Sequence, residues 1–300
     1  QCGSSQQAVH FAAQGVLSGA YDMVVACGVE SMSRVPMGSN VRGAEDPFGP
    51  GVAALFPEGL VPQGISAELI AAKWGLSRAQ MDAFAAGSHQ KAAAAWANGL
   101  FDAEVAPLEG VTRDESVRPA TTTEILAGLK PAYYDPGYAE RFPQIDWSVT
   151  AGNASPINDG ASAVLITSSE TAARLGLRPL ARLHSFAVTG SDPLLMLTGV
   201  VPATEKVLRK AGLALGDIDL FEVNEAFASV VLTWQQETGA DLSRVNVHGG
   251  AIALGHPLGA SGTRLTTTLV HAMRERGARY GLQTMCEAGG LANAMDIEAV

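Results

Sequence analysis

The chain has 300 residues, of which 47% are hydrophobic and 17% are charged, and its formal net charge is -10. This composition is typical of a globular protein with ample apolar surface for a core, and the length favours about two domains. An acidic chain repels phosphate backbones, so we expect no nucleic-acid partner. No apolar run reaches the ~20 residues that a membrane-spanning helix needs, so we expect no membrane partner either.

The first thirty residues predict a turn, a helix and a strand. A small-residue turn at 2–5 precedes apolar residues at helical spacing, and the helix is expected to end near Gly19. Residues 22–28 form an apolar run that is typical of a buried strand. This order is half of a βαβ unit whose first strand would precede Gln1. Because the chain begins with Gln1 rather than Met, we expect a processed or truncated chain with an incomplete first half.

Residues 33–157 predict a helical insertion rather than strand–helix alternation. Two stretches rich in Pro and Gly, at 36–51 and 119–143, are typical of loops. Ser77 and Gln80 have the spacing of a capping box, which marks the start of a helix. The two helices predicted in this insertion cover residues 65–74 and 78–97.

From residue 161 onward, strands and helices alternate again, which is typical of an α/β fold. Residues 3–27 and 259–286 share one order of turn, helix, glycine, strand and cysteine, which favours two related halves, although any two α/β units would look alike at this level. The predicted strands cover 163–166, 181–188, 218–223, 245–247 and 282–286. The predicted helices cover 202–211, 225–238 and 259–275. The expected division is 1–32 with 158–178 for the first half and 179–300 for the second.

Three cysteines that lie far apart do not form the disulfide framework of a small secreted protein. No signal peptide heads the chain, so we expect a reducing compartment and a cytoplasmic location. Cys2 lies at a turn that opens a helix, where backbone N–H groups would stabilise a thiolate and lower the thiol pKa. Cys286 precedes a Gly-rich turn able to face an anion. A buried structural role is the alternative for both, and Cys27, inside an apolar strand, is expected in the core.

His256 lies between Gly255 and Pro257 in a loop rich in Gly, Ser and Pro that precedes a helix. Such a loop would hold the imidazole in one orientation as a base and indicates close backbone approach. Asn224 follows a predicted strand and starts a helix, at the kind of strand end where α/β folds gather ligands, although it also suits a helix cap. No P-loop, HExxH or paired CxxC motif is present, so we expect neither a metal nor a nucleotide cofactor.

Five segments together resemble the thiolase superfamily, and they occur in that family's order across the whole chain. They are Gln1-Cys2-Gly3-Ser4, Thr150–Ser155 continuing to Asn158-Asp159-Gly160, Asn224-Glu225-Ala226-Phe227-Ala228, Gly255-His256-Pro257-Leu258-Gly259, and Cys286 with the turn that follows it. The resemblance implies two related thiolase-type βαβαβ halves, the first incomplete, with the insertion covering an acyl-CoA site.

The resemblance also implies roles for single residues. Cys2 would be the acylated nucleophile, His256 its base, and Cys286 the group that moves a proton to and from the α-carbon of acetyl-CoA. Asn224 would hold a water that, with His256, stabilises the thioester enolate. The two cysteines, the histidine and the asparagine supply the nucleophile, proton shuttle and oxyanion donors that Claisen chemistry needs.

Further roles follow from the same resemblance. The backbone N–H groups of Cys2 and Ala288 would form an oxyanion hole for attack on the acyl carbon, and His256 would contribute to the one for the enolate. Ser155 would lie near the pantetheine arm of CoA, and Phe227 would line its tunnel. Acyl-CoA and CoA would be the ligands, with CoA as a substrate and no cofactor, and the protein would be a homodimer or homotetramer.

The implied activity is that of a 3-ketoacyl-CoA thiolase (acetyl-CoA acyltransferase) in fatty acid metabolism, including β-oxidation, and lacking its N-terminal portion. As it stands, such a chain is expected to be poorly active or unstable. One alternative is a decarboxylating ketosynthase of related fold, which Asn224 and Cys286 argue against. The other is a non-catalytic acyl-CoA-binding protein, which the incomplete first half favours.

The chain departs from the family's usual residues at several positions. Gly is usual in the family at Ser5, Pro156 and Ala288, and Asn is usual at His248. At Ala288, a backbone that needed positive φ would be strained by the Cβ. Members specific for acetoacetyl-CoA usually carry His-Met where this chain has Pro62-Gln63, which weakens a prediction of two-carbon specificity.

Overall fold

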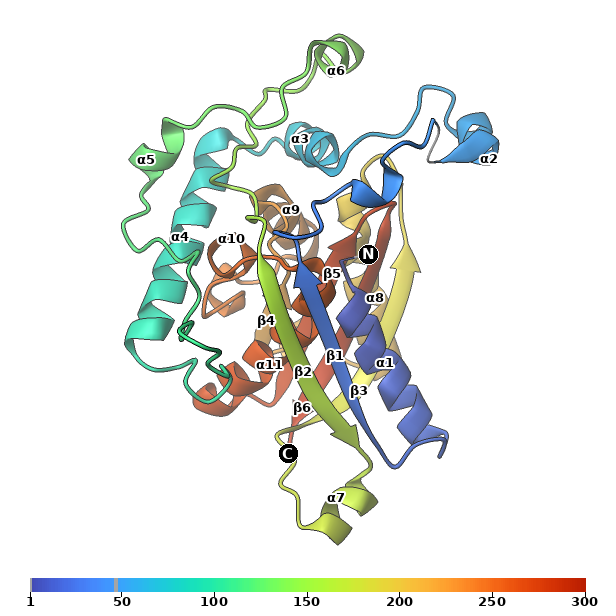
Figure 1. Cartoon of the computed structure of the whole chain (residues 1–300), viewed down its shortest axis with the longest axis vertical. Helices are drawn as coiled ribbons and strands as arrows, with labels where there is room; N and C mark the ends of the chain where they lie inside the picture. The colour runs from blue at the N-terminus through green and yellow to red at the C-terminus, as the bar shows by residue number, and fades with distance from the viewer. Residues whose placement is uncertain (1, 46–47) are drawn as a thin grey trace.

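The computed structural model describes residues 2–45 and 48–300 (Figure 1). Gln1 and part of the loop predicted over 36–51 therefore lie outside the described residues. The strands form a four-stranded sheet in the order β3-β6-β5-β4 and a two-stranded sheet of β1 and β2. The strands are β1 (Met23–Ser31), β2 (Asp159–Thr167), β3 (Ala181–Gly190), β4 (Leu220–Val223), β5 (Tyr280–Glu287) and β6 (Leu291–Ala299). Among these strands, β4 and β5 are the pair that runs parallel.

Two helices, α1 (Ser4–Leu17) and α11 (Leu258–Arg276), pack between the two sheets. Several glycines allow this close approach. A Cβ on Gly262 would overlap the backbone of Gln6 in α1, and a Cβ on Gly28 would overlap the backbone of Gly259. The sequence predicted that another backbone lies close to the Gly-rich loop, and the backbones that do so belong to α1 and β1.

Helices pack on both faces of the four-stranded sheet, and its edge strand β3 stays partly exposed. Its β5 and β6 strands bury almost every residue. On the face away from α11, the largest apolar cluster joins the sheet to α8 (Val200–Ala211) and α9 (Ala228–Thr238), with Trp234 fully buried against Phe221. No helix in the described ranges is long and apolar enough to cross a bilayer.

The β1–β2 sheet is covered on only one face among the described residues. Ala26 packs toward α1 and α11, whereas Val25, Cys27 and Val29 are exposed on the opposite face. The prediction of Cys27 in the core is therefore wrong. Strand side chains alternate between faces, and an apolar run does not reveal whether both faces are covered.

The span between β1 and β2 contains helices and isolated β-bridges but, in the residues described, no strand. Figure 1 shows these helices across the top and left of the view. The capping box of Ser77 and Gln80 is confirmed at the start of α4. The helices are α2 (Gly49–Leu55), α3 (Gln63–Lys73), α4 (Arg78–Ala97), α5 (Thr123–Ala127) and α6 (Pro136–Arg141).

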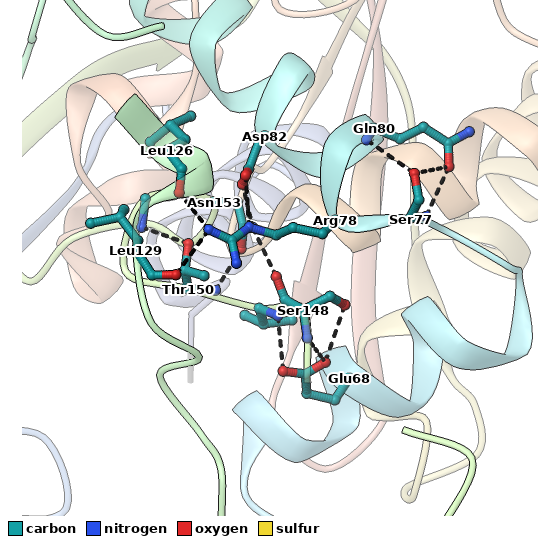
Figure 2. Close-up of polar contacts among 12 residues, drawn as sticks. Glu68, Ser77, Arg78, Gln80, Asp82, Leu126, Leu129, Ser148, Thr150 and Asn153 are labelled. Atoms are coloured by element: carbon teal, nitrogen blue, oxygen red, sulfur yellow. Dashed lines mark hydrogen bonds and ion pairs between the residues drawn. The ribbon is translucent and has the colours of Figure 1, made fainter. Parts of the chain in front are cut away.

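Buried polar contacts fix α3 and α4 to the chain that returns toward β2 (Figure 2). Glu68 of α3 accepts hydrogen bonds from the backbone N–H groups of Ser148 and Val149, both at 2.9 Å. Asp82 of α4 forms an ion pair with Arg78 and accepts a hydrogen bond from Asn153. These contacts replace water around buried charges, so both helices are held firmly next to residues 148–153.

The strand predicted over 245–247 is wrong. Val245 forms only a single bridge to Phe221, and Asn246 has a φ of 46°. The Asn246 side chain bonds both backbone polar groups of Val223, at 2.9 Å each. Asparagine tolerates the left-handed backbone conformation, and here its side-chain amide makes the hydrogen bonds to β4 that the backbone of a neighbouring strand would otherwise make.

Besides the short helices α2, α5, α6 and α10, the strand β6 and the helix α7 had no sequence prediction. β6 was missed because Asn293, Asp296 and Glu298 interrupt its apolar pattern, although the strand is almost wholly buried. The helix α7 (Ser169–Leu175) follows β2 and begins at a Ser168 cap. The remaining short elements are α10 (Ala251–Leu254) and the 3₁₀ turns Ser39–Val41, Met196–Gly199, Leu215–Asp217 and Leu242–Arg244.

Candidate active site

The parallel strands β4 and β5 end side by side and bring two predicted site residues to one sheet edge. Val223 pairs with Thr284, and the next residue, Asn224, donates its backbone N–H to Thr284 O at 3.1 Å. Cys286 lies two residues beyond Thr284. The carboxyl ends of parallel strands are where α/β folds place ligands.

His256 is hydrogen-bonded to Asn224 within this edge. The Asn224 Nδ2 lies 3.3 Å from His256 Nε2, and His256 Nδ1 lies 2.6 Å from Ser261 Oγ. Ser261 donates its only hydroxyl proton to Pro257 O, so it accepts from Nδ1–H. The Nε2 atom therefore carries the lone pair. Burial lowers the pKa of His256 to about 3, with a smaller contribution from Arg264, so the ring is a neutral base.

Cys2 precedes α1 and is 4% exposed, packed against Leu258, Leu265 and Met285. Burial raises its pKa, which corrects the expectation of a lowered value. The loss of hydration outweighs the donors that face the sulfur, among them the Gln63 side chain and the Ala288 backbone N–H.

Cys286 is 1% exposed at the end of β5. Burial raises its pKa far above the ordinary thiol value, and the neighbouring Cys2 adds to the shift. Two buried thiols that influence each other electrostatically would both be protonated at neutral pH in the free protein. Such a pair is able to give or take protons when charge develops on a bound substrate.

The turn after Cys286 tolerates its unusual alanine. Gly289 and Gly290 have φ values of 80° and 87°, whereas Ala288 is not among the residues with positive φ. The strain considered for Ala288 is therefore absent. Its backbone N–H faces Cys2.

Ser155 and Phe227 lie together beside the Asn224 turn. The Ser155 N–H donates to Ala226 O at 3.0 Å, and Ala154 forms a bridge with Phe227. Phe227 is buried and contacts Tyr133 edge-on. The structure thus brings both residues next to Asn224, and their contact with CoA stays a prediction.

The site residues form two groups, which lie at neighbouring strand ends and share no direct hydrogen bond in the described structure. Cys2 lies with Cys286 and Ala288, and His256 lies with Asn224. No hydrogen bond joins Cys2 to His256 in the part of the chain that the structure describes. Catalytic contacts are often long when substrate is absent, so this geometry is compatible with the predicted roles.

Sequence reasoning missed three polar residues around the site. Ser261 fixes the His256 tautomer from one helical turn along α11. Glu225 is fully buried and accepts hydrogen bonds from Ser88, Asn246 and Ile252, which ties α4 to the loop before His256. An acidic residue within an apolar segment, directly after Asn224, was the available signal. The third, Gln63, contacts Cys2 and had no sequence signal beyond its departure from the family pattern.

Comparisons with known proteins place the whole chain in one family. The family model for the thiolase N-terminal domain matches residues 1–170, and that for the thiolase C-terminal domain matches residues 177–299. A 3-ketoacyl-CoA thiolase of Bacillus subtilis is 44% identical over 310 residues, which cover 98% of this chain and 76% of that protein. An acetyl-CoA acetyltransferase of Pseudomonas aeruginosa is also 44% identical and covers 99% of this chain and 77% of its own length.

A solved structure shares the fold. The human mitochondrial 3-ketoacyl-CoA thiolase in complex with CoA matches with a TM-score of 0.88 and 39% identity, over 100% of this chain and 76% of that one. The α/β prediction with a thiolase-type fold is therefore confirmed. Together, the two family matches, the identities and the shared fold show that the chain belongs to the thiolase family, acyltransferases that use CoA as a substrate and need no cofactor.

Proposed function

We propose that this thiolase cleaves 3-ketoacyl-CoA esters with CoA, or runs the reverse condensation, with Cys2 as the acylated nucleophile. The observation that carries the proposal is the contact between His256 and Asn224 at the same sheet edge as Cys286. Relatives named for 3-ketoacyl-CoA thiolysis support the substrate class.

In the first half-reaction, the Cys2 thiol gives its proton to His256 Nε2, and its sulfur attacks the 3-keto carbon. The Cys2 and Ala288 amides stabilise the oxyanion. The bond between carbons 2 and 3 then breaks, leaving an acyl thioester on Cys2 and the enolate of acetyl-CoA. Cys286 protonates the enolate carbon and becomes a thiolate. Two groups stabilise the enolate oxygen: the charged His256 imidazolium and a water held by Asn224. The Asn224 Oδ1 has no hydrogen-bond partner in the described structure and is free to hold this water.

In the second half-reaction, free CoA gives its thiol proton to the Cys286 thiolate, and the CoA sulfur attacks the acyl carbon. The Cys2 sulfur leaves and recovers its proton from His256. Both cysteines and the histidine return to their starting states. The raised thiol pKa values are consistent with this cycle, because each thiolate exists only while a substrate is present.

Ser155 and Phe227 are proposed to contact the pantetheine arm from beside Asn224. We also infer a cytoplasmic homodimer or homotetramer, on family resemblance alone. Light scattering at micromolar concentration would report the assembly, and a monomer mass would contradict it.

The direct test of function is thiolysis of acetoacetyl-CoA and of a ten-carbon 3-ketoacyl-CoA, followed by loss of the enolate absorbance. Measured on the protein at its natural full length, we expect turnover that depends on free CoA and disappears in Cys2→Ala. Binding of acyl-CoA without turnover would favour the non-catalytic alternative. Decarboxylation of a malonyl thioester would favour a ketosynthase.

A further inference from the structure

We propose that Gln63 is a further catalytic residue, whose side-chain amide donates to the Cys2 sulfur each time that sulfur becomes anionic. The inference rests on the proposed role of Cys2 as the nucleophile. Gln63 Nε2 lies 4.0 Å from Cys2 Sγ, at the long end of an N–H···S contact. Such a contact strengthens when the acceptor gains charge.

The position of Gln63 is set by a rigid helix. Gln63 is the first residue of α3, and residues 64–71 behind it are buried. Glu68 fastens α3 to the backbone at 148–149, and a Cβ on Gly64 would overlap the Tyr133 ring. Because the helix cannot shift without breaking these contacts, the backbone of Gln63 is held where its amide reaches the sulfur before substrate binds. A preorganised donor needs no reorganisation as charge develops.

The Glu287 carboxylate acts on the Cys2 thiol in the opposite sense to Gln63. The Gly3 N–H, next to Cys2, bonds to Glu287, and Asn293 Nδ2 donates to Gly3 O at 3.3 Å. The Glu287 charge raises the pKa of Cys2, whereas Gln63 lowers it. Cys286 and the Ala288 amide also face Cys2 from β5 and its turn, and the apolar Leu258 and Leu265 of α11 pack against it.

Gln63 affects the rate at those steps in which the Cys2 sulfur carries a negative charge. Cys2 is anionic as it attacks the substrate and again as it leaves the acyl group, and it is neutral as a thiol or thioester. A donor that interacts more strongly with the anion lowers both barriers without tightening ground-state binding. We therefore expect loss of Gln63 to lower kcat and to leave KM nearly unchanged.

The test compares Gln63→Met with Gln63→Glu in a Cys27→Ser background. Methionine keeps the length and removes the donor, and glutamate keeps the shape and adds a negative charge. The readout is the rate of Cys2 alkylation by iodoacetamide between pH 7 and 9, by peptide mass mapping. A shift of about one unit in thiol pKa would slow alkylation about tenfold at fixed pH. We expect Gln63→Met to slow Cys2 alkylation about tenfold. Gln63→Glu is expected to slow it further, and Glu287→Gln is expected to speed it up.

Steady-state thiolysis completes the test. We expect Gln63→Met to lower kcat about tenfold with KM changed less than about twofold, in line with the lost interaction. Equal alkylation profiles and equal kcat in wild type and Gln63→Met would overturn the inference, as would equal effects of methionine and glutamate, which would indicate packing alone. If Cys2→Ala keeps its turnover, the proposed function fails as well. If Cys2→Ala is inactive and Gln63→Met is normal, only this inference fails.

Discussion

The four-stranded sheet and the two-stranded sheet each carry a cysteine in an apolar strand, in opposite surroundings. In β5, every residue from Gly281 to Glu287 is buried, and Cys286 is 1% exposed. In β1, buried Ala26 lies between Val25 and Cys27, which are both exposed. Helices cover both faces of the first sheet, whereas α1 and α11 cover one face of the second among the described residues.

The two cysteines show that solvent exposure of a thiol and a role in catalysis are different properties. Cys27 is open to solvent, but no polar turn or charged partner surrounds it in the described structure. Cys286 is closed to solvent and lies beside Cys2 and the strand edge that holds Asn224 and His256. A thiol gains a function in catalysis from neighbours that exchange protons with it, and exposure alone supplies none.

The largest expected contrast is between the two cysteines. Cys286→Ala is expected to lower the thiolysis rate by about 10³-fold, within the range for removal of a positioned acid–base group. Cys27→Ala is expected to change it less than twofold, because its side chain lies outside the site. Steady-state rates with acetoacetyl-CoA and CoA measure both. A similar loss of thiolysis rate in both variants would contradict the claim that Cys286 belongs to the site and Cys27 does not.

A stability contrast is expected between two leucines. Leu282 in β5 is fully buried, and Leu165 in β2 is 53% exposed. Leu282→Ala is expected to lower the free energy of unfolding by about 3 kcal/mol through lost burial and a cavity. Leu165→Ala is expected to cost less than about 1 kcal/mol. Urea unfolding of both variants provides the values, and a reversed order would show that the sheets are covered differently in solution.

A pH effect is expected from the buried His10 of α1, which stacks on Phe186 of β3. Burial lowers its pKa from 6.5 to about 4. Between these values the unfolded chain binds more protons than the folded one, so this contribution to stability falls as pH drops below 6.5. From pH 7 to 5 the loss is about 2 kcal/mol.

His10→Phe provides the control for that effect, because phenylalanine keeps the ring stack and does not titrate. Its unfolding free energy should lose about 2 kcal/mol less than that of the wild type between pH 7 and 5. An identical pH dependence in the two proteins would mean that His10 is protonated, or solvated, in the folded state.

The smallest effect is expected on the open face of β1. Val25 is 60% exposed, so Val25→Thr keeps a β-branched side chain and should change the unfolding free energy by less than about 0.5 kcal/mol. Thermal unfolding over a range of protein concentrations measures the change. A large and concentration-dependent loss would instead indicate that another copy of the chain covers this face.

The sequence predicts those parts of the fold that local signals control. The capping box of Ser77 and Gln80 is confirmed, because a cap depends on residues three apart. The exposure of Cys27 and the raised pKa of Cys2 were not predictable, since both depend on which distant elements cover them. β6 escaped prediction because its buried residues include Asn293 and Asp296, which local patterns assign to the surface.

The candidate site divides in the same way. Motifs identified Cys2, Asn224, His256 and Cys286 as candidates, and the structure shows how Asn224 and His256 bond and how Cys2 and Cys286 influence each other. The supporting residues Ser261 and Gln63 could not be found from sequence, because their importance lies in contacts across the fold.

The most direct measurement of the central claim is the location of the acyl group during the reaction. The protein is mixed briefly with a 3-ketoacyl-CoA in the absence of free CoA, quenched in acid, and mapped by peptide mass. If the strand-edge residues form one site with Cys2 as nucleophile, the acyl group is on Cys2, is absent from Cys27 and Cys286, and disappears when CoA is added. An acyl group on Cys286 or Cys27, or an unmodified Cys2 during active turnover, would contradict the account.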